Sequence, residues 1–410
     1  MIGQCPKWPS HVIWPGGGPS ELAEQEADQA LAVIRDTYAR VVAAGDDAAA
    51  YFYGWLFMTN PELRDLFPPA MDTQRDRLFA ALTRIVDGLA APAEMAGYLA
   101  RLGVDHRKYG VQPRMYLPVG NALIATIRAF SGSAFTRFAE RAWMNAYEAA
   151  ALYMIKAAEQ DRAGAPAQWT AEVVAHDKRG HRIAVLTVEP DQPLRYQAGQ
   201  HATVQTERWP RVWRPYSIAC RPRDDGLLRF HVKAVPGGWV SGALVDHTKV
   251  GDRITLGPAV GGMLLESAGQ RDLICIAGGT GLAPLKAIVE QVATAETGSA
   301  SHRHVLLFCG ARTEAELYDM KDLWQLTTSY PWLRVYPVAS ADRGYRGMQG
   351  NVGQVAARYL PNAECEAFVA GPAAMVRQTI DVLTKAGQPI ERIHFDEALL
   401  VPRRPGTSGT

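Results

Sequence analysis

Apolar residues recur every three or four positions through the first 160 residues. Two series show this spacing: Leu31, Ile34, Tyr38 and Val41, and then Leu78, Leu82, Ile85 and Leu89. The spacing predicts amphipathic helices that bury one face. The stretch NPELRDLFPP predicts a short helix, with Asn60 as its cap, Pro61 in its first turn and Pro68 at its end.

The periodicity changes after a short segment rich in Ala, Gly and Pro, DRAGAPAQ. The runs RIAVLTVEP, HATVQT, YSIAC and LRFHVKAV are short, rich in β-forming residues and divided by Gly and Pro. This pattern predicts a small antiparallel barrel. From Arg271 onward, buried strands such as DLICIAGG alternate with helices such as PLKAIVEQVATA, which predicts a parallel α/β sheet.

The expected fold class is therefore multidomain: an all-α domain, then an antiparallel β-barrel, then an α/β domain. The expected boundaries are an extension at 1–20, a helical domain at 21–162, a linker at 163–168, a barrel at 169–266, an α/β domain at 267–400 and a tail at 401–410.

Composition narrows the class of protein. The 410 residues carry a net charge of +1, so no general electrostatic attraction to nucleic acid is expected. No apolar run reaches the ~20 residues of a membrane helix, and the N-terminus does not resemble a signal peptide. The five scattered cysteines suit free thiols in the cytoplasm and exclude a closely spaced iron–sulfur motif. A monomer or weak homo-oligomer is expected.

His106 is the first candidate for chemistry. It follows Met95, Leu99 and Leu102 at steps of four, three and four, so it lies on the apolar face of a helix. By itself this pattern is also typical of a core histidine with one hydrogen bond. Tyr53 and Gln74 also stand on otherwise apolar helix faces, and buried polar side chains need partners.

The order of segments along the chain favours a ligand over a core histidine. The segments YFYGWLFMTNPELRDLFP, QRDRLFAAL, LGVDHRKYGVQPRMYLPVGNALIATI and AWMNAY together resemble the globin domain of flavohaemoglobins. The resemblance implies that His106 is the proximal ligand of haem b iron and that Phe67 packs against the haem. It implies catalytic roles for Tyr53 and Gln74 on the distal side, beside bound O2, and for Tyr116 on the proximal side.

One position departs from the family on the last helix of this domain. Flavohaemoglobins carry a glutamate near the proximal histidine, and an ungapped alignment from Trp143 places Ala158 there, with Glu159 next. A shift of one residue rotates a side chain by ~100° around a helix. The sequence therefore leaves the proximal hydrogen-bond network open.

The segment RPYSIA carries the candidate flavin site. Arg214 and Tyr216 lie on one face of a strand and Ser217 on the other. A planar guanidinium suits a pyrophosphate, a phenol ring stacks on isoalloxazine, and a serine reaches the flavin edge. The alternative is an ordinary exposed barrel strand.

A second segment, VKAVPGGWVSGAL, follows the candidate flavin strand. It contributes Gly237, Gly238, Val240 and Ser241 at the start of a helix, where phosphate groups bind. With YQAGQHATV, these stretches resemble the FAD domain of the ferredoxin-reductase superfamily.

A glycine-rich turn follows the strand DLICIAGG. Gly278, Gly279, Thr280 and Gly281 allow close approach of a phosphate, although Pro284 replaces the third glycine of a dinucleotide fingerprint. The superfamily resemblance implies that this turn binds the NAD(P)H pyrophosphate. It also implies a role for the later segment AGPAAM, which contributes Gly371 and Pro372 and has Ala370 where the family has cysteine.

Two further positions bear on the choice of nicotinamide cofactor and on flavin access. Arg312 could contact a 2′-phosphate, but Glu314 and Glu316 would repel one, which favours NADH over NADPH. At the C-terminus, Asp396 and Ala398 replace a glutamate and an aromatic residue that covers the flavin in the family.

The three sites together imply transfer of electrons from NADH through FAD to haem. The resemblance implies an NO dioxygenase that converts NO and O2 to nitrate. Three alternatives remain. One is a haem–flavin reductase acting on a ferric chelate, a quinone or D-lactate. The others are an O2-binding or sensing globin and a haem-free helical bundle attached to a reductase.

Overall fold

The computed structural model describes residues 21–180, 182–295, 303–360 and 364–396. The chain forms two compact units, Met1–Ala167 and Gln168–Thr410. The expected extension at 1–20, the tail at 401–410 and Ala398 lie outside the described residues. The boundaries expected within each unit stay predictions.

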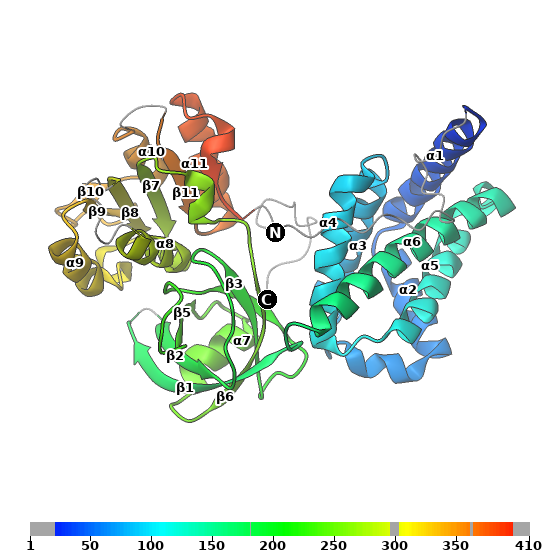
Figure 1. The fold of residues 1–410 in the computed structure, drawn as a ribbon, viewed down its shortest axis with the longest axis horizontal. Helices are drawn as coiled ribbons and strands as arrows, with labels where there is room; N and C mark the ends of the chain where they lie inside the picture. Colours follow the sequence, from blue (N-terminus) through cyan, green and yellow to red (C-terminus); the bar gives the residue numbers. More distant parts are fainter. Residues whose placement is uncertain (1–20, 181, 296–302, 361–363, 397–410) are drawn as a thin grey trace. The chain divides into compact units, whose positions relative to one another are not determined.

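The first unit is helical, as predicted (Figure 1). Its α-helices among the described residues are α1 (Glu21–Ala44), α2 (Asp46–Thr59), α3 (Asp72–Gly88), α4 (Pro92–His106), α5 (Tyr116–Ser131) and α6 (Arg137–Arg162). Short 3-10 segments join them: η1 (Pro61–Leu66), η2 (Arg107–Tyr109), η3 (Pro113–Met115) and η4 (Gly132–Ala134).

The apolar series found in the sequence faces a common core. Ile34, Tyr38 and Val41 of α1 are all buried there. One local prediction was wrong, because Asn60 precedes η1 but does not cap it with its side chain. The amide of Asn60 donates instead to the hydroxyl of Thr59, and Pro61 opens the short helix.

Helices α4 and α6 pack with their backbones close together. A Cβ atom on Gly103 of α4 would lie 2.2 Å from the carbonyl oxygen of Met154 in α6. Only glycine allows this approach. The contact holds α6 against the last turn of α4, which ends at His106.

The second unit begins with the predicted antiparallel barrel. Its elements are β1 (Trp169–Lys178), β2 (Ile183–Pro190), β3 (His201–Thr206), β4 (Arg214–Ser217), β5 (Leu228–Lys233), α7 (Trp239–Gly242), η5 (Ala243–His247), β6 (Arg253–Val260) and η6 (Leu265–Ala268). The strand order is β4-β3-β6-β1-β2-β5. A bridge between Ile218, just after β4, and Phe230 of β5 nearly closes the barrel.

The rest of the unit is a parallel sheet in the order β10-β9-β8-β7-β11-β12. Its elements are β7 (Leu273–Gly278), η7 (Gly279–Gly281), α8 (Leu282–Ala295), β8 (Val305–Ala311), η8 (Glu314–Glu316), α9 (Met320–Ser329), β9 (Leu333–Ala339), β10 (Met348–Gln349), α10 (Val352–Ala357), β11 (Glu366–Ala370), α11 (Ala373–Lys385), η9 (Ile390–Arg392) and β12 (Ile393–His394). Figure 1 shows helices on both faces.

Every residue of the central strand β7 is buried, as expected of a parallel strand covered on both faces. The core on the α8 side of the sheet also includes Ala198, Met263 and Ala268, which precede the sheet in the chain. Residues that precede the sheet in the chain therefore contribute to the apolar core on its α8 side. Among the described residues, no helix is both long enough and apolar enough to cross a membrane.

Candidate functional site

His106 is the last residue of α4, and its ring is oriented by its own helix. Its Nδ1 lies 2.7 Å from the carbonyl oxygen of Leu102, one turn earlier. A carbonyl can only accept, so Nδ1 carries the proton and Nε2 keeps its lone pair. Burial lowers the pKa of His106, which keeps the imidazole neutral. Haem iron is commonly bound by a neutral imidazole whose other nitrogen donates a hydrogen bond. His106 therefore fits the implied cofactor.

The proximal side is organised by a tyrosine that the sequence did not single out. The hydroxyl of Tyr147 in α6 donates to the carbonyl oxygen of Tyr116, the first residue of α5. The ring of Tyr147 fits only because residue 120 is glycine, where a Cβ atom would lie 2.5 Å from it. Burial raises the pKa of Tyr116 to about 12.

The departure at the proximal glutamate has a structural outcome. Glu159 is exposed on α6, and Ala158 is half-buried. Within the described part of the chain, no hydrogen bond joins Glu159 or Tyr116 to His106. Among the described residues, the hydrogen bond of the His106 side chain is the one that Nδ1 donates to the Leu102 carbonyl of its own helix.

The structure brings the three predicted distal residues together. Tyr53 in α2 is 4% exposed, and its hydroxyl donates to the backbone carbonyl of Gln74 in α3 across 3.3 Å. Phe67 packs edge-on against the Tyr53 ring at 5.6 Å between centroids. Burial raises the pKa of Tyr53, so its phenol stays protonated and available as a donor. A hydrogen bond as long as 3.3 Å is readily exchanged for a better acceptor.

The predicted flavin strand is β4. Arg214 donates to the adjacent Trp213 carbonyl, and burial raises the pKa of Tyr216. His201 of β3 lies directly opposite Ser217, and its Nδ1 is 3.8 Å from a carboxylate oxygen of Asp396. Asp396, predicted from the C-terminal motif, therefore lies beside the strand pair that contains Ser217. A guanidinium, a phenol and a serine on one strand fit FAD.

The turn before α7 is held by its own contacts. Gly237 has a positive φ of 69°, and a Cβ atom on Gly238 would lie 2.3 Å from the Ser241 hydroxyl oxygen. That hydroxyl donates to the Gly238 carbonyl and accepts from the Val235 amide. Local packing alone therefore requires Gly238, and Ser241 shapes the turn. Val240 is buried beneath it.

The second glycine turn lies where two central strands end. A Cβ atom on Gly281, after β7, would lie 2.2 Å from the Ala370 carbonyl oxygen at the end of β11. A Cβ atom on Gly278 would meet the terminal methyl of Met375, a flexible side chain that can move, whereas Gly279 has a φ of 54° and open space around it. Backbone packing thus requires Gly281, while Gly279 leaves backbone accessible to a ligand.

This turn has the location expected of a dinucleotide site. Strands β7 and β11 are neighbours at which the strand order reverses, and ligands bind there at the carboxyl ends of the strands. Gly371 and Thr280 lie in the two turns that meet at this point, and the turns fit a pyrophosphate.

Arg312 follows β8, as predicted, but it already has a partner. Its guanidinium Nη2 is 2.7 Å from Glu316, whose carboxylate also lies 3.8 Å from the Lys233 ammonium. Glu316 is buried, whereas Glu314 is exposed. The hydrogen bond from Arg312 lowers the pKa of Glu316, which keeps the carboxylate charged. Of the two glutamates, Glu316 is therefore the one that engages Arg312.

Comparisons with known proteins bear on each domain. A globin family model matches residues 50–154, an oxidoreductase FAD-binding domain matches 169–263, and an oxidoreductase NAD-binding domain matches 275–381. The xylene/toluene monooxygenase electron transfer component XylA of Pseudomonas putida is 32% identical over 55% of this chain. The chain spans 65% of the length of that relative.

Relatives that also share the helical unit decide the family. A flavohemoprotein of Deinococcus radiodurans is 28% identical over 392 residues, which is 88% of this chain and 94% of the relative. The chain belongs to the flavohaemoglobin family. The crystal structure of a Malassezia yamatoensis flavohemoglobin with bound FAD and heme has the same fold, with a TM-score of 0.72 at 21% identity. The aligned region covers 90% of this chain and 98% of that structure.

Family membership confirms the predicted fold class and the three cofactor-binding modules of a haem–flavin NAD(P)H oxidoreductase. The roles of individual residues within this flavohaemoglobin stay predictions.

Sequence reasoning missed several residues around these sites. Tyr147 lies in the quoted segment AWMNAY but was given no role, and no motif marked His231, Lys286, Glu290 or Asp319 as functional. A lysine at 2% exposure on a helix is unusual, but only the tertiary structure reveals its burial.

Proposed function

We propose that this flavohaemoglobin is an NO dioxygenase driven by NADH. Haem at His106 supplies the site for O2, and FAD accepts hydride from NADH and releases electrons singly. The observation that carries the proposal is the distal arrangement: a buried, protonated Tyr53 whose hydroxyl donates a long hydrogen bond to the backbone carbonyl of Gln74. The small-molecule partners would be O2 and NO.

Each residue would act through a property described above. His106 would hold the haem iron through Nε2, with its ring kept in place by the Leu102 carbonyl. Tyr53 would offer its hydroxyl as a hydrogen-bond donor to a small molecule bound on the distal side. Phe67 fixes the Tyr53 ring from its edge and helps exclude water. Tyr116, held by Tyr147, supports the proximal wall.

The reductase residues divide between the two nucleotides. Arg214, Tyr216 and Ser217 would hold FAD, with the turn from Gly237 to Ser241 near its phosphates. For NADH, the backbone at Gly279 and Thr280 would receive the pyrophosphate, and Glu316 would face the adenosine ribose. A carboxylate there accepts hydrogen bonds from ribose hydroxyls and repels a 2′-phosphate.

The test uses the full chain loaded with haem and FAD. With NADH in air, an NO pulse should disappear rapidly and yield nitrate. Tyr53→Phe should raise the O2 dissociation rate about tenfold, the equivalent of one hydrogen bond of about 1.4 kcal/mol. The NO consumption rate should fall with it.

Tyr38→Phe is the matched control for the distal hydroxyl. Tyr38 is another buried tyrosine of the same core, and its hydroxyl is 2.8 Å from that of Thr83. It should cost a similar stability and leave O2 binding unchanged. NO loss no faster than without NADH would contradict the dioxygenase proposal.

A second candidate is a haem–flavin reductase with a different electron acceptor. The exposed Glu159 favours it, because among the described residues no carboxylate forms a hydrogen bond with His106. The likeness to XylA, an electron transfer component, also supports it. Steady NADH oxidation with a ferric chelate or a quinone in the absence of NO would distinguish this activity.

A further inference from the structure

Helix α8 connects the predicted nicotinamide turn to the barrel. It begins directly after the turn Gly279–Gly281, and most of its residues are buried. Two charged residues, Lys286 and Glu290, stand one turn apart on it and therefore share a face. Lys286 is only 2% exposed. A long charged side chain is rarely buried to this degree without a specific partner.

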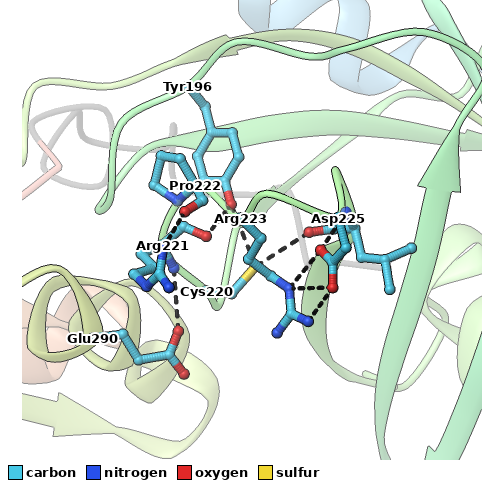
Figure 2. A network of polar contacts seen from close by, with 8 residues as sticks. Tyr196, Cys220, Arg221, Pro222, Arg223, Asp225 and Glu290 are labelled. Atoms are coloured by element: carbon cyan, nitrogen blue, oxygen red, sulfur yellow. Dashed lines mark hydrogen bonds and ion pairs between the residues drawn. The ribbon is translucent and has the colours of Figure 1, made fainter. Parts of the chain in front are cut away.

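Glu290 contacts the segment that follows the flavin strand. Its carboxylate accepts the backbone N–H of Arg221 at 3.2 Å (Figure 2), four residues after Ser217. The carbonyl of Arg221 accepts a hydrogen bond of 2.6 Å from the Tyr196 hydroxyl. The backbone carbonyl of Arg221 is thus hydrogen-bonded to the barrel, and its backbone N–H is hydrogen-bonded to α8.

Lys286 forms a second polar contact where the α/β domain meets the barrel. Its ammonium is 2.6 Å from Asp319, which is 1% exposed at the start of α9, and 3.4 Å from Asp322. Arg179, just after β1 of the barrel, lies 3.7 Å and 3.5 Å from the same two carboxylates.

A neutral hydrogen bond crosses beside this charged group. The Tyr318 hydroxyl is 2.8 Å from Nδ1 of His231 in β5. The barrel and the α/β domain are therefore joined by directional contacts at more than one place along α8.

These hydrogen bonds and ion pairs are directional, whereas the apolar contacts around them are not. Apolar packing tolerates small sliding movements, whereas hydrogen bonds weaken steeply with distance and angle. Buried ion pairs add little net stability, because desolvation offsets their attraction, but they restrict geometry. Hydride transfer requires donor and acceptor carbons or nitrogens within about 3–3.5 Å and in line.

We propose that Lys286 and Glu290 are positioning residues for hydride transfer. Glu290, through the Arg221 amide, and Lys286, through Asp319, hold the Gly279–Gly281 turn at a fixed place relative to strand β4. The inference rests on the proposed placement of FAD and NADH. It does not depend on NO being the final substrate.

The decisive pair of variants is Glu290→Leu and Glu290→Gln. Leucine removes the acceptor for the Arg221 amide, whereas the glutamine carbonyl keeps one. In the full chain with haem and FAD, anaerobic rapid mixing with NADH measures the limiting rate of flavin reduction. Glu290→Leu should lower this rate about tenfold, with little change in half-saturating NADH, and Glu290→Gln should restore most of it.

A second readout is independent of catalysis. In the flavin-free full chain, hydrogen exchange at residues 218–222 and 279–283 should become faster in Glu290→Leu and in Lys286→Met. The matched control is Glu366→Gln, at the first residue of β11 and so at the end of the strands opposite the Gly279–Gly281 turn. There Glu366 is buried and paired with Arg271 at 2.9 Å.

The outcomes separate a positioning role from a structural one. The proposal is overturned if Glu290→Leu reduces flavin at the native rate, or if Glu366→Gln slows reduction equally at equal loss of stability. Native flavin reduction without NO consumption would overturn the dioxygenase proposal and leave this one standing. Failure of NADH to reduce the flavin in the native protein would overturn both.

Discussion

At the scale of single residues, the structure changed the role of Arg312. Its position after β8 suggested a contact with a 2′-phosphate, and the sequence predicted that two nearby glutamates would repel that phosphate. In the structure, only Glu316 of the two accepts a hydrogen bond from the Arg312 side chain. Glu316 also lies near Lys233 of the barrel. One buried carboxylate therefore neutralises the two cations that could bind an additional phosphate.

We expect Glu316→Gln to relax the preference for NADH. Without the carboxylate charge, Arg312 and Lys233 become available to a 2′-phosphate. The KM for NADPH should fall severalfold, with a small rise in the KM for NADH. Steady-state ferricyanide reduction measures both.

The exposed Glu314 provides the control for charge alone. Glu314→Gln removes the same charge from the same loop but leaves Arg312 paired. An equal gain in NADPH use in this variant would show that general repulsion sets the preference, and would refute the role given to Glu316.

At the scale of elements, the position of His106 depends on how α4 packs. Gly103, three residues before the histidine, brings α4 against the backbone of α6 at Met154. Gly97 lies on the same helix, but a Cβ atom there would meet nothing closer than 3.5 Å, the end of the Arg101 side chain. Packing therefore requires glycine at position 103, whereas position 97 has room for a side chain.

We expect Gly103→Ala to destabilise the helical unit by about 1–3 kcal/mol, the usual cost of overpacking. It should also speed haem loss, because the end of α4 moves away from α6. Gly97→Ala should stabilise the helix by about 0.5–1 kcal/mol. Urea unfolding followed at the Soret band measures both, and equal behaviour of the two variants would refute this account of α4 packing.

At the scale of the whole molecule, both units bury charged side chains beside an apolar core. The helical unit buries two cationic residues in η2. The second unit buries charged and titratable groups where the barrel meets the sheet. His231 is 4% exposed there, and its Nε2 has no hydrogen-bond partner among the described residues. Burial, with Lys286, Arg229 and Arg179 nearby, lowers the pKa of His231 well below its usual value.

This burial predicts acid sensitivity of the second unit. The unfolded chain binds a proton at His231 near pH 6.5, whereas the folded chain does not. The stabilisation is therefore complete above pH 6.5 and is lost as the pH falls, by up to about 1.4 kcal/mol per pH unit. The free energy of unfolding, measured in denaturant at several pH values with flavin release as the signal, should show this slope.

His231→Gln should remove that slope while keeping a polar partner for Tyr318. The same substitution at the exposed His247 should leave the slope as it is in the native protein. A slope that persists in His231→Gln would assign the acid sensitivity to other groups.

Much of the architecture was predictable because local periodicity carries it. Three patterns in the sequence match three parts of the structure. The helical spacing before residue 162 matches the helical unit, the short strands after it match the barrel, and the strand–helix alternation after Arg271 matches the α/β domain. Strands β1 and β6 were not separately predicted, since their apolar positions do not stand out from neighbouring segments. The order of motifs also identified the family and the candidate residues His106, Tyr53, Arg214 and Gly279.

The sequence by itself determined the family, the order of domains and the residue types available to each cofactor, because these depend on local pattern and motif order. The tertiary structure decided which residues meet. Gly103 meets Met154, Glu316 meets Arg312, and Glu290 meets the amide of Arg221. Such pairs join separate segments, and no local periodicity encodes them. Burial turns the same side chains into neutral ligands, fixed charges or positioning contacts, and burial exists only in the folded chain.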